Sequence, residues 1–109
     1  MKYYIYMLRC SDNSLYTGIT TDPARRMQEH FSASAQCAKY TRSHPPQKLE
    51  ALWSCDGRAA ASRLEYRIKR LTRKKKLDAA EKNDLSFLGE DAALYKREED
   101  MPCVIRREN

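Results

Sequence analysis

The sequence predicts an α+β fold in which a small three-stranded antiparallel sheet is flanked by helices. Three short runs are rich in aromatic, β-branched and other apolar residues, as strands are, whereas two other stretches repeat their apolar residues at every third or fourth position, as helices do. The length of 109 residues is that of one domain with one modest core and is too short for two. We therefore expect one functional site on one scaffold.

The first two strands are expected to form a hairpin. Residues 2–10 and 14–19 carry the aromatic and apolar side chains typical of strands, and the polar turn Ser11-Asp12-Asn13-Ser14 separates them. Because Met1 runs directly into the first strand, no apolar segment with a cleavage site precedes it. We expect a cytoplasmic protein for this reason.

A helix is predicted over residues 22–32. Asp22 can cap its N-terminus and Pro23 suits the first helical position. Apolar side chains then recur at helical spacing, at Ala24, Met27 and Phe31. Residues 33–47 have no sustained period, so they are expected to form a loop with at most one short helical turn near residues 38–40.

The second half of the chain predicts one more strand and two more helices. Residues 48–54 alternate and indicate a third strand with one face on the core. The helix expected at 57–71 has an apolar stripe at steps of three and four, made by Ala61, Leu64, Ile68 and Leu71. A further helix is expected at 73–83. We divide the chain into a domain at 1–83 and a charged tail at 84–109, a loose appendage with a short helix around 90–98.

Charge and cysteine content narrow the function classes. Lys and Arg outnumber Asp and Glu by 21 to 15, which favours a polyanionic partner, although the same excess would also serve solubility. Apolar runs are far shorter than the roughly 20 residues of a membrane span, so no membrane partner is expected. The four widely spaced cysteines form no C-x-x-C pair and indicate neither a zinc site nor a disulfide framework. We expect Cys10 and Cys55 to be reduced core residues.

Two tyrosine triplets, an arginine and a histidine form the most specific pattern in the sequence. Tyr4-Ile5-Tyr6 lies in the first strand and Tyr16-Thr17-Gly18 in the second, and Arg26 and His30 follow one helical turn apart. This pattern resembles the GIY-YIG nuclease superfamily over about residues 2–77, and in particular its small single-domain bacterial branch. Tyr4 stands where the family usually has glycine, and Thr17 where it usually has isoleucine or valine.

The resemblance implies a GIY-YIG endonuclease-like fold and a DNA endonuclease active site. It carries over a catalytic set of Tyr6, Tyr16, Arg26, His30 and Glu65, in which Glu65 is the single metal ligand. It implies Mg²⁺, with Mn²⁺ as the alternative, and no small-molecule cofactor. A role in DNA repair, recombination or breakdown follows, whereas the preference for DNA over RNA and the oligomeric state stay open.

These residue types also suit phosphodiester hydrolysis on chemical grounds. Mg²⁺ takes one or two protein carboxylates and fills its other positions with water and phosphate, so a lone Glu65 is sufficient. Arg26 can donate two parallel hydrogen bonds to a phosphate. Nearby cations could lower the pKa of Tyr6 or Tyr16 enough for one of them to deprotonate the water, and the sequence does not say which. His30 could relay a proton or hold a phosphate.

Each of these residues also has a purely structural interpretation. Strand tyrosines are most often packing residues, Arg26 alone would be a solvated helix residue, and His30 alone a capping or surface residue. Glu65 alone is most simply the i, i+4 partner of Lys69. Gly18 serves either a tight exit from the strand or the approach of substrate. The joint pattern is what favours the catalytic interpretation.

The cations between residues 58 and 76 are expected to bind phosphates. Nine Lys and Arg residues lie there with Glu65 as the one carboxylate. The proposed nucleic-acid contacts are Lys39, Tyr40, Arg42, Lys69, Arg70, Arg73, Lys74 and Lys75. Two other functions remain open: a non-catalytic nucleic-acid-binding module on the same fold, and a domain whose basic helix docks on an acidic protein.

Overall fold

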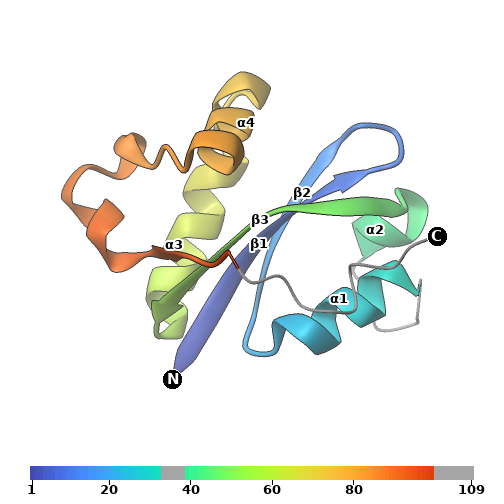
Figure 1. Ribbon diagram of the computed structural model, residues 1–109, viewed down its shortest axis with the longest axis horizontal. Coiled ribbons are helices and arrows are strands. Elements are labelled where there is room, and N and C mark those ends of the chain that lie inside the picture. Colours follow the sequence, from blue (N-terminus) through green and yellow to red (C-terminus); the bar gives the residue numbers. More distant parts are fainter. Residues whose placement is uncertain (33–38, 100–109) are drawn as a thin grey trace.

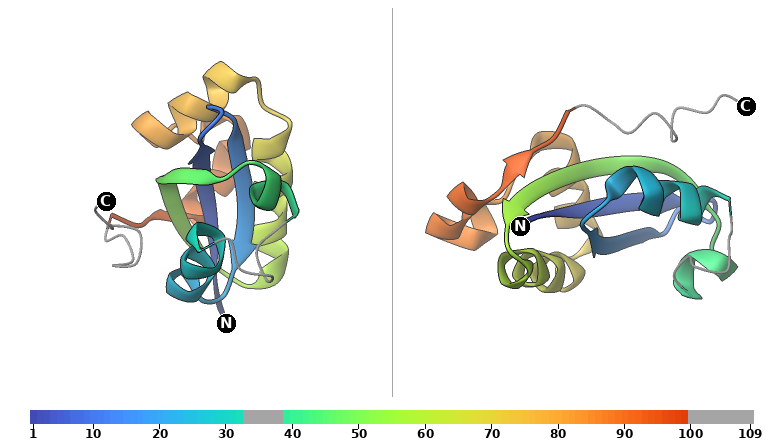
Figure 2. Two further views of the ribbon diagram at one scale, coloured as in Figure 1. Left: turned by 90° about the vertical axis from the view of Figure 1, so that its right-hand side faces the viewer. Right: turned by 90° about the horizontal axis from the view of Figure 1, so that it is seen from below.

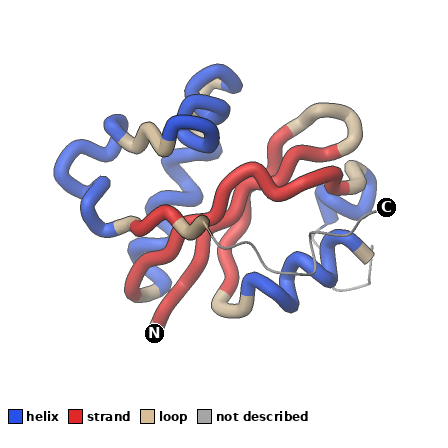
Figure 3. The backbone as a smooth tube through the Cα atoms, in the orientation of Figure 1, coloured by secondary structure: helices blue, strands red, loops and turns tan. Residues whose placement is uncertain are grey.

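A four-stranded antiparallel sheet forms the centre of the protein in the computed structural model, which describes residues 1–32 and 39–99 (Figures 1 and 3). Its strands are β1 (Lys2–Cys10), β2 (Leu15–Thr20), β3 (Pro46–Asp56) and β4 (Lys96–Arg97), in the order β2-β1-β3-β4. The three expected strands are confirmed. The expectation of three strands in all is wrong, because β4 adds a short fourth strand beside β3.

The described helices are α1 (Pro23–Phe31), α2 (Lys39–Ser43), α3 (Arg58–Lys69), α4 (Arg73–Lys82) and the 3-10 helix η1 (Ser86–Leu94). The three predicted helices are confirmed with ends within two residues of the expected ones, and the short turn expected in the loop is α2. Asp22 caps α1 by accepting a hydrogen bond from the Arg25 amide, and Thr72 caps α4 in the same way. Figure 1 shows α1 and α2 at one end of the sheet and α3, α4 and η1 at the other.

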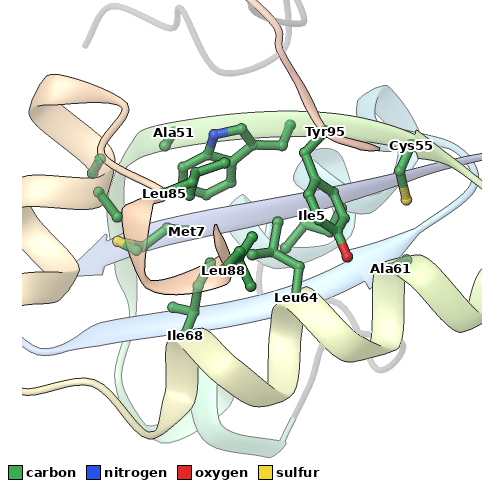
Figure 4. Close-up of a cluster of buried hydrophobic side chains, with 13 residues drawn as sticks. Ile5, Met7, Ala51, Cys55, Ala61, Leu64, Ile68, Leu85, Leu88 and Tyr95 are labelled. Atoms are coloured by element: carbon green, nitrogen blue, oxygen red, sulfur yellow. The ribbon is translucent and has the colours of Figure 1, made fainter. Parts of the chain in front are cut away.

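The sheet is covered on both faces, as the two views of Figure 2 show with α1 and α3 on opposite sides of the strands. Alternation along β1 sends Ile5 and Met7 to the face of α3, and Tyr6 and Leu8 to the face of α1. The larger core, drawn in Figure 4, lies under α3, α4 and η1. The smaller core contains Tyr6, Leu8, Met27, Leu49 and Leu52.

The expectation that the third strand has one face on the core is wrong. Residues 51–55 of β3 are all buried, with Trp53 in the larger core and Leu52 in the smaller one. A strand covered by helices on both faces is apolar on both, so it does not show clean alternation. Cys10 and Cys55 are buried free thiols, as expected, while Cys37 and Cys103 lie outside the described residues.

The described part of the tail, residues 84–99, packs on the larger core and is not a loose appendage. Leu85, Leu88 and Tyr95 are buried there (Figure 4). The Tyr95 hydroxyl donates a hydrogen bond of 2.6 Å to the Ala60 carbonyl oxygen. The short helix expected around 90–98 is present only over its first half, since η1 ends at Leu94 and β4 follows. These three apolar residues stand among many charged ones and do not repeat with a helical period, so the sequence did not predict their burial. Within the described ranges, no helix is long and apolar enough to cross a membrane.

Candidate active site

Tyr6 and Gly18 face each other across the hairpin and fix the floor of the site. They are paired in the β1–β2 register, and the Tyr6 ring lies over Gly18. A Cβ atom on Gly18 would come within 2.5 Å of the Tyr6 hydroxyl oxygen, so a larger residue would displace the phenol. Gly18 lies inside β2, which makes a tight strand exit the wrong explanation for it. It leaves room for Tyr6.

Helix α1 brings Arg26 and His30 onto Tyr6. The two residues lie one turn apart on the helix face that meets the sheet, and His30 is completely buried. The His30 Nε2 atom is 2.7 Å from the Tyr6 hydroxyl oxygen, and the Arg26 Nε–H donates a longer bond of 3.4 Å to the same oxygen. Three of the five predicted catalytic side chains therefore meet at one buried phenol.

Glu29 holds the other end of the Arg26 side chain, a contact that the sequence analysis missed. The Arg26 Nη1 atom lies 2.6 Å from the Glu29 Oε1 atom, and the Arg26 side chain is 24% exposed. The i, i+3 spacing of the two residues was the available signal. The neighbouring Arg25 is far more exposed, with 68% of its side chain accessible, so α1 presents two arginines of different kinds. Arg26 is the one held in place over the site.

Tyr16 forms the outer wall of the site with residues of α2. Its ring centroid lies 5.8 Å from that of His30 and 6.3 Å from that of Tyr6, and the residue is half-buried. Tyr40 stacks on Tyr16 at 5.5 Å, and His44 stacks on Tyr40 at 4.0 Å. Of the residues predicted on this loop to bind nucleic acid, Tyr40 thus belongs to the site. His44 was not predicted.

Helix α3 carries Glu65 toward the two tyrosines. Lys69 lies between Glu65 and Tyr16, because the Lys69 Nζ atom is 3.1 Å from the Glu65 Oε2 atom and 5.7 Å from the centroid of the Tyr16 ring. The structural interpretation of Glu65 as the partner of Lys69 is therefore confirmed. Its negative charge is also close enough to act on Tyr6, where it raises the pKa of the phenol.

Burial sets the protonation of the two innermost groups. Burial, with the nearby Arg26 charge second, lowers the pKa of His30 to about 4, so its imidazole is neutral at pH 7. Burial also raises the pKa of Tyr6 well above its usual value of 10.0, and the hydrogen bond from Arg26 offsets only part of that rise. The expectation that cations lower the phenol's pKa is wrong for Tyr6, because desolvation of the phenolate outweighs them.

The donor set for a metal ion is small. Among residues 1–32 and 39–99, no three His, Cys, Asp or Glu side chains gather as a ready metal cluster. One half-buried carboxylate, Glu65, stands beside the tyrosines, which fits a hard cation that keeps waters and takes a phosphate oxygen. It does not fit zinc, whose sites use three or four nitrogen and sulfur ligands.

The remaining predicted nucleic-acid contacts are exposed cations on three helices. Lys39 and Arg42 lie on α2, beside the site. Lys69 and Arg70 lie at the end of α3, where the Arg70 guanidinium is 5.4 Å from the centroid of the exposed Tyr66 ring. The α4 cations, Arg73, Lys74 and Lys75, stand apart from α1 and α2 in Figure 1. The α4 helix therefore lies away from the helix that carries Lys39 and Arg42, whereas Lys69 lies over the Tyr16 ring at the site.

Comparisons with known proteins confirm the family resemblance of the sequence. The family model of the GIY-YIG catalytic domain matches residues 2–78. A UPF0213 protein of Fusobacterium nucleatum is 48% identical over 88 residues, which cover 81% of this chain and 85% of that protein. A UPF0213 protein of Haloquadratum walsbyi is 47% identical over 79 residues, 72% of this chain and 86% of that protein. These names state no activity.

A solved structure is also similar in sequence. It is the solution NMR structure of a UPF0213 protein from Bacillus halodurans, which is 46% identical to this chain. The match covers 70% of this chain and 79% of that chain, with a TM-score of 0.45.

Proposed function

The chain belongs to the GIY-YIG catalytic-domain family, and from that premise we propose that it is a Mg²⁺-dependent endonuclease that hydrolyses phosphodiester bonds in DNA. The proposed setting is cytoplasmic repair, recombination or breakdown of DNA. One observation supports it most: three elements bring a buried phenol, a neutral imidazole, a guanidinium and a carboxylate to one place, with Tyr6 from β1, Arg26 and His30 from α1 and Glu65 from α3. Tyr16 from β2 completes the wall.

Arg26 is the proposed phosphate contact. Glu29 and Tyr6 hold its guanidinium in a defined direction before substrate arrives, so little side-chain freedom is lost on binding. Its N–H donors can turn to the oxygens of a scissile phosphate and meet the negative charge that grows on them during the reaction. The weak 3.4 Å contact with Tyr6 is then given up, which releases the Tyr6 hydroxyl oxygen for the attacking water.

Tyr6 and His30 are the proposed proton acceptors. Because burial raises the pKa of Tyr6, a free phenolate is costly there, and the phenol needs to lose its own proton as it gains one. The neutral His30 lies 2.7 Å away and can take that proton at Nε2. The water proton passes to the Tyr6 oxygen and the Tyr6 proton passes to His30 as the water oxygen bonds to phosphorus. The bond between phosphorus and the leaving oxygen breaks, and the leaving oxygen takes a proton from solvent. Because the pKa of His30 is about 4, the imidazolium then returns its proton to solvent. Tyr16 lies beside this path and orients the water.

Glu65 is the residue that would hold Mg²⁺. When bound, the ion would supply positive charge to the phosphoryl oxygens and to the leaving oxygen. Lys69 would compete with the ion for Glu65, since its ammonium group pairs with the Glu65 carboxylate at 3.1 Å. Ion pairs at i, i+4 on helices are worth only about 0.3–0.5 kcal/mol, and half of the Lys69 side chain is exposed, so a divalent cation can displace the ammonium group.

A paired measurement on the wild type and Glu65→Gln tests the proposal. Nicking of plasmid and branched DNA is followed across a titration of Mg²⁺ and of Mn²⁺, and DNA affinity is measured at fixed salt. Glutamine keeps the size and helix propensity of glutamate, so DNA binding by Lys and Arg should persist while cleavage collapses. Glu81→Gln, which neutralises an exposed carboxylate on α4, is the matched control and should cut like the wild type.

Each other result points to a different function. Salt-sensitive DNA binding without nicking in either metal would make the protein a non-catalytic nucleic-acid-binding module. Equal nicking by the wild type and Glu65→Gln at every metal concentration would remove Glu65 from the metal site. The absence of salt-sensitive nucleic-acid binding would favour an acidic protein partner instead.

A further inference from the structure

Thr41 lies at the back of the site, on α2 between Tyr40 and Arg42, two of the residues predicted to contact nucleic acid. The residue is 1% exposed, and its Oγ1 atom lies 2.8 Å from the Nδ1 atom of His30. Both ring nitrogens of His30 therefore form hydrogen bonds, Nδ1 with Thr41 and Nε2 with Tyr6. A histidine held in this way has a single ring orientation, and its tautomer follows from its two partners.

The hydrogen bonds around Tyr6 determine which His30 nitrogen carries the proton. The Tyr6 hydroxyl has one proton to donate, and it is almost completely buried. Arg26 can only donate, so within the described part of the chain His30 Nε2 is the acceptor that lies within hydrogen-bond distance. Nε2 must then be unprotonated. Because burial lowers the pKa of His30 to about 4, the ring carries one proton at pH 7, and that proton is on Nδ1.

We propose that Thr41 is a positioning residue of the active site: its hydroxyl oxygen accepts the His30 Nδ1–H and so fixes the tautomer whose Nε2 is open to the Tyr6 proton. A base oriented by a third group is a general arrangement for moving a proton in a buried site. The effect of Thr41 on cleavage rests on the proposed nuclease function. Its effect on the tautomer does not.

The short helix α2 gives this role a structural basis. Two successive residues of α2 contact two different catalytic side chains, because Tyr40 stacks on Tyr16 and Thr41 meets His30. Helix α2 thus contributes Tyr40 to the outer wall and Thr41 to the back of the site, and it positions the imidazole through one buried hydroxyl. Serine at this position would retain the hydroxyl, whereas valine would retain the size and lose it.

The tautomer of His30 is the direct test. Long-range ¹H–¹⁵N spectra of ¹⁵N-histidine-labelled protein at pH 7 distinguish Nδ1–H from Nε2–H for the wild type, Thr41→Val and Thr41→Ser. The expected result is Nδ1–H in the wild type and in Thr41→Ser, and a mixture or the opposite tautomer in Thr41→Val. Thr17→Val removes another buried threonine hydroxyl, on the opposite face of β2 from Tyr16, and should leave the spectrum unchanged. Nε2–H in the wild type would overturn the proposal.

Cleavage kinetics give the second readout. Thr41→Val should lower kcat by roughly 10- to 100-fold, below the full contribution of general acid–base catalysis, with DNA affinity unchanged, and Thr41→Ser should restore most of the rate. If Thr41→Val does not fold, the His30 tautomer of the wild type and of Thr41→Ser still tests the proposal. A wild type that does not cut DNA would overturn the nuclease function, and the spectra alone would then decide the role of Thr41. A wild-type rate together with a wild-type spectrum in folded Thr41→Val would overturn that role.

Discussion

Acid should destabilise this protein through His30, because the folded state holds that imidazole neutral. Burial and the Arg26 charge lower its pKa from 6.5 to about 4 in the folded chain. The unfolded chain therefore takes up the proton first as the pH falls. The stabilising contribution of the neutral ring is complete above about pH 6.5, is lost between about pH 6.5 and 4, and levels off below that. A difference of two to three pKa units corresponds to about 3 kcal/mol in the free energy of unfolding.

Urea unfolding at several pH values between 4 and 8 measures this loss. Other carboxylates and cations also titrate, so the quantity of interest is the difference between the wild type and His30→Gln, which has no imidazole to protonate. As the pH falls from 7 to 4, the free energy of unfolding of the wild type should fall by about 3 kcal/mol more than that of His30→Gln. His44→Gln removes the other histidine and should keep the wild-type contribution of His30. Parallel pH curves for the wild type and His30→Gln would show that burial does not perturb His30.

Three further changes test the site and the fold. Arg26→Ala should lower the nicking rate by a hundredfold or more and leave the fold intact by circular dichroism. Substitution of the exposed Arg25 by alanine should leave the nicking rate unchanged. Normal turnover in folded Arg26→Ala would exclude a role of Arg26 in catalysis. Gly18→Ala should cost roughly 1–3 kcal/mol by thermal unfolding and abolish cleavage, because its methyl group would lie 2.5 Å from the Tyr6 hydroxyl oxygen; an unchanged Tm would refute that clash. Deletion of residues 84–109 should lower the free energy of unfolding by roughly 5 kcal/mol in urea, since three buried apolar side chains leave the larger core. Equal stability of the shortened chain would support the predicted domain boundary after residue 83.

Local patterns predicted most of the fold, because strands and helices in this chain have distinct apolar periods and clear boundary residues. Asp22 and Pro23 marked the start of α1, and the apolar stripe marked α3. The two-residue strand β4 consists of Lys96 and Arg97, and neither residue type is typical of strands. Its place in the sheet depends on pairing with β3, which no local pattern reveals.

The resemblance supplied the five candidate catalytic residues, and the structure adds how they are held. No spacing in the sequence links Thr41 to His30, since the contact depends on how α2 packs against α1. Burial was equally hidden, and it reversed the expected direction of the Tyr6 pKa. The metal-binding role of Glu65 remains a prediction, and so does DNA as the substrate.

The division of apolar residues between the two faces of the sheet has a consequence for hydrogen exchange. The face of α1 and α2 rests on the smaller cluster and on a few buried hydrogen bonds, while α3, α4 and η1 share the larger one. Segments with less apolar burial open at lower free energy than the global unfolding reaction. Amides of α1 and α2 should therefore exchange before those of α3, so that the wall of the site can open and close while the rest of the sheet stays folded.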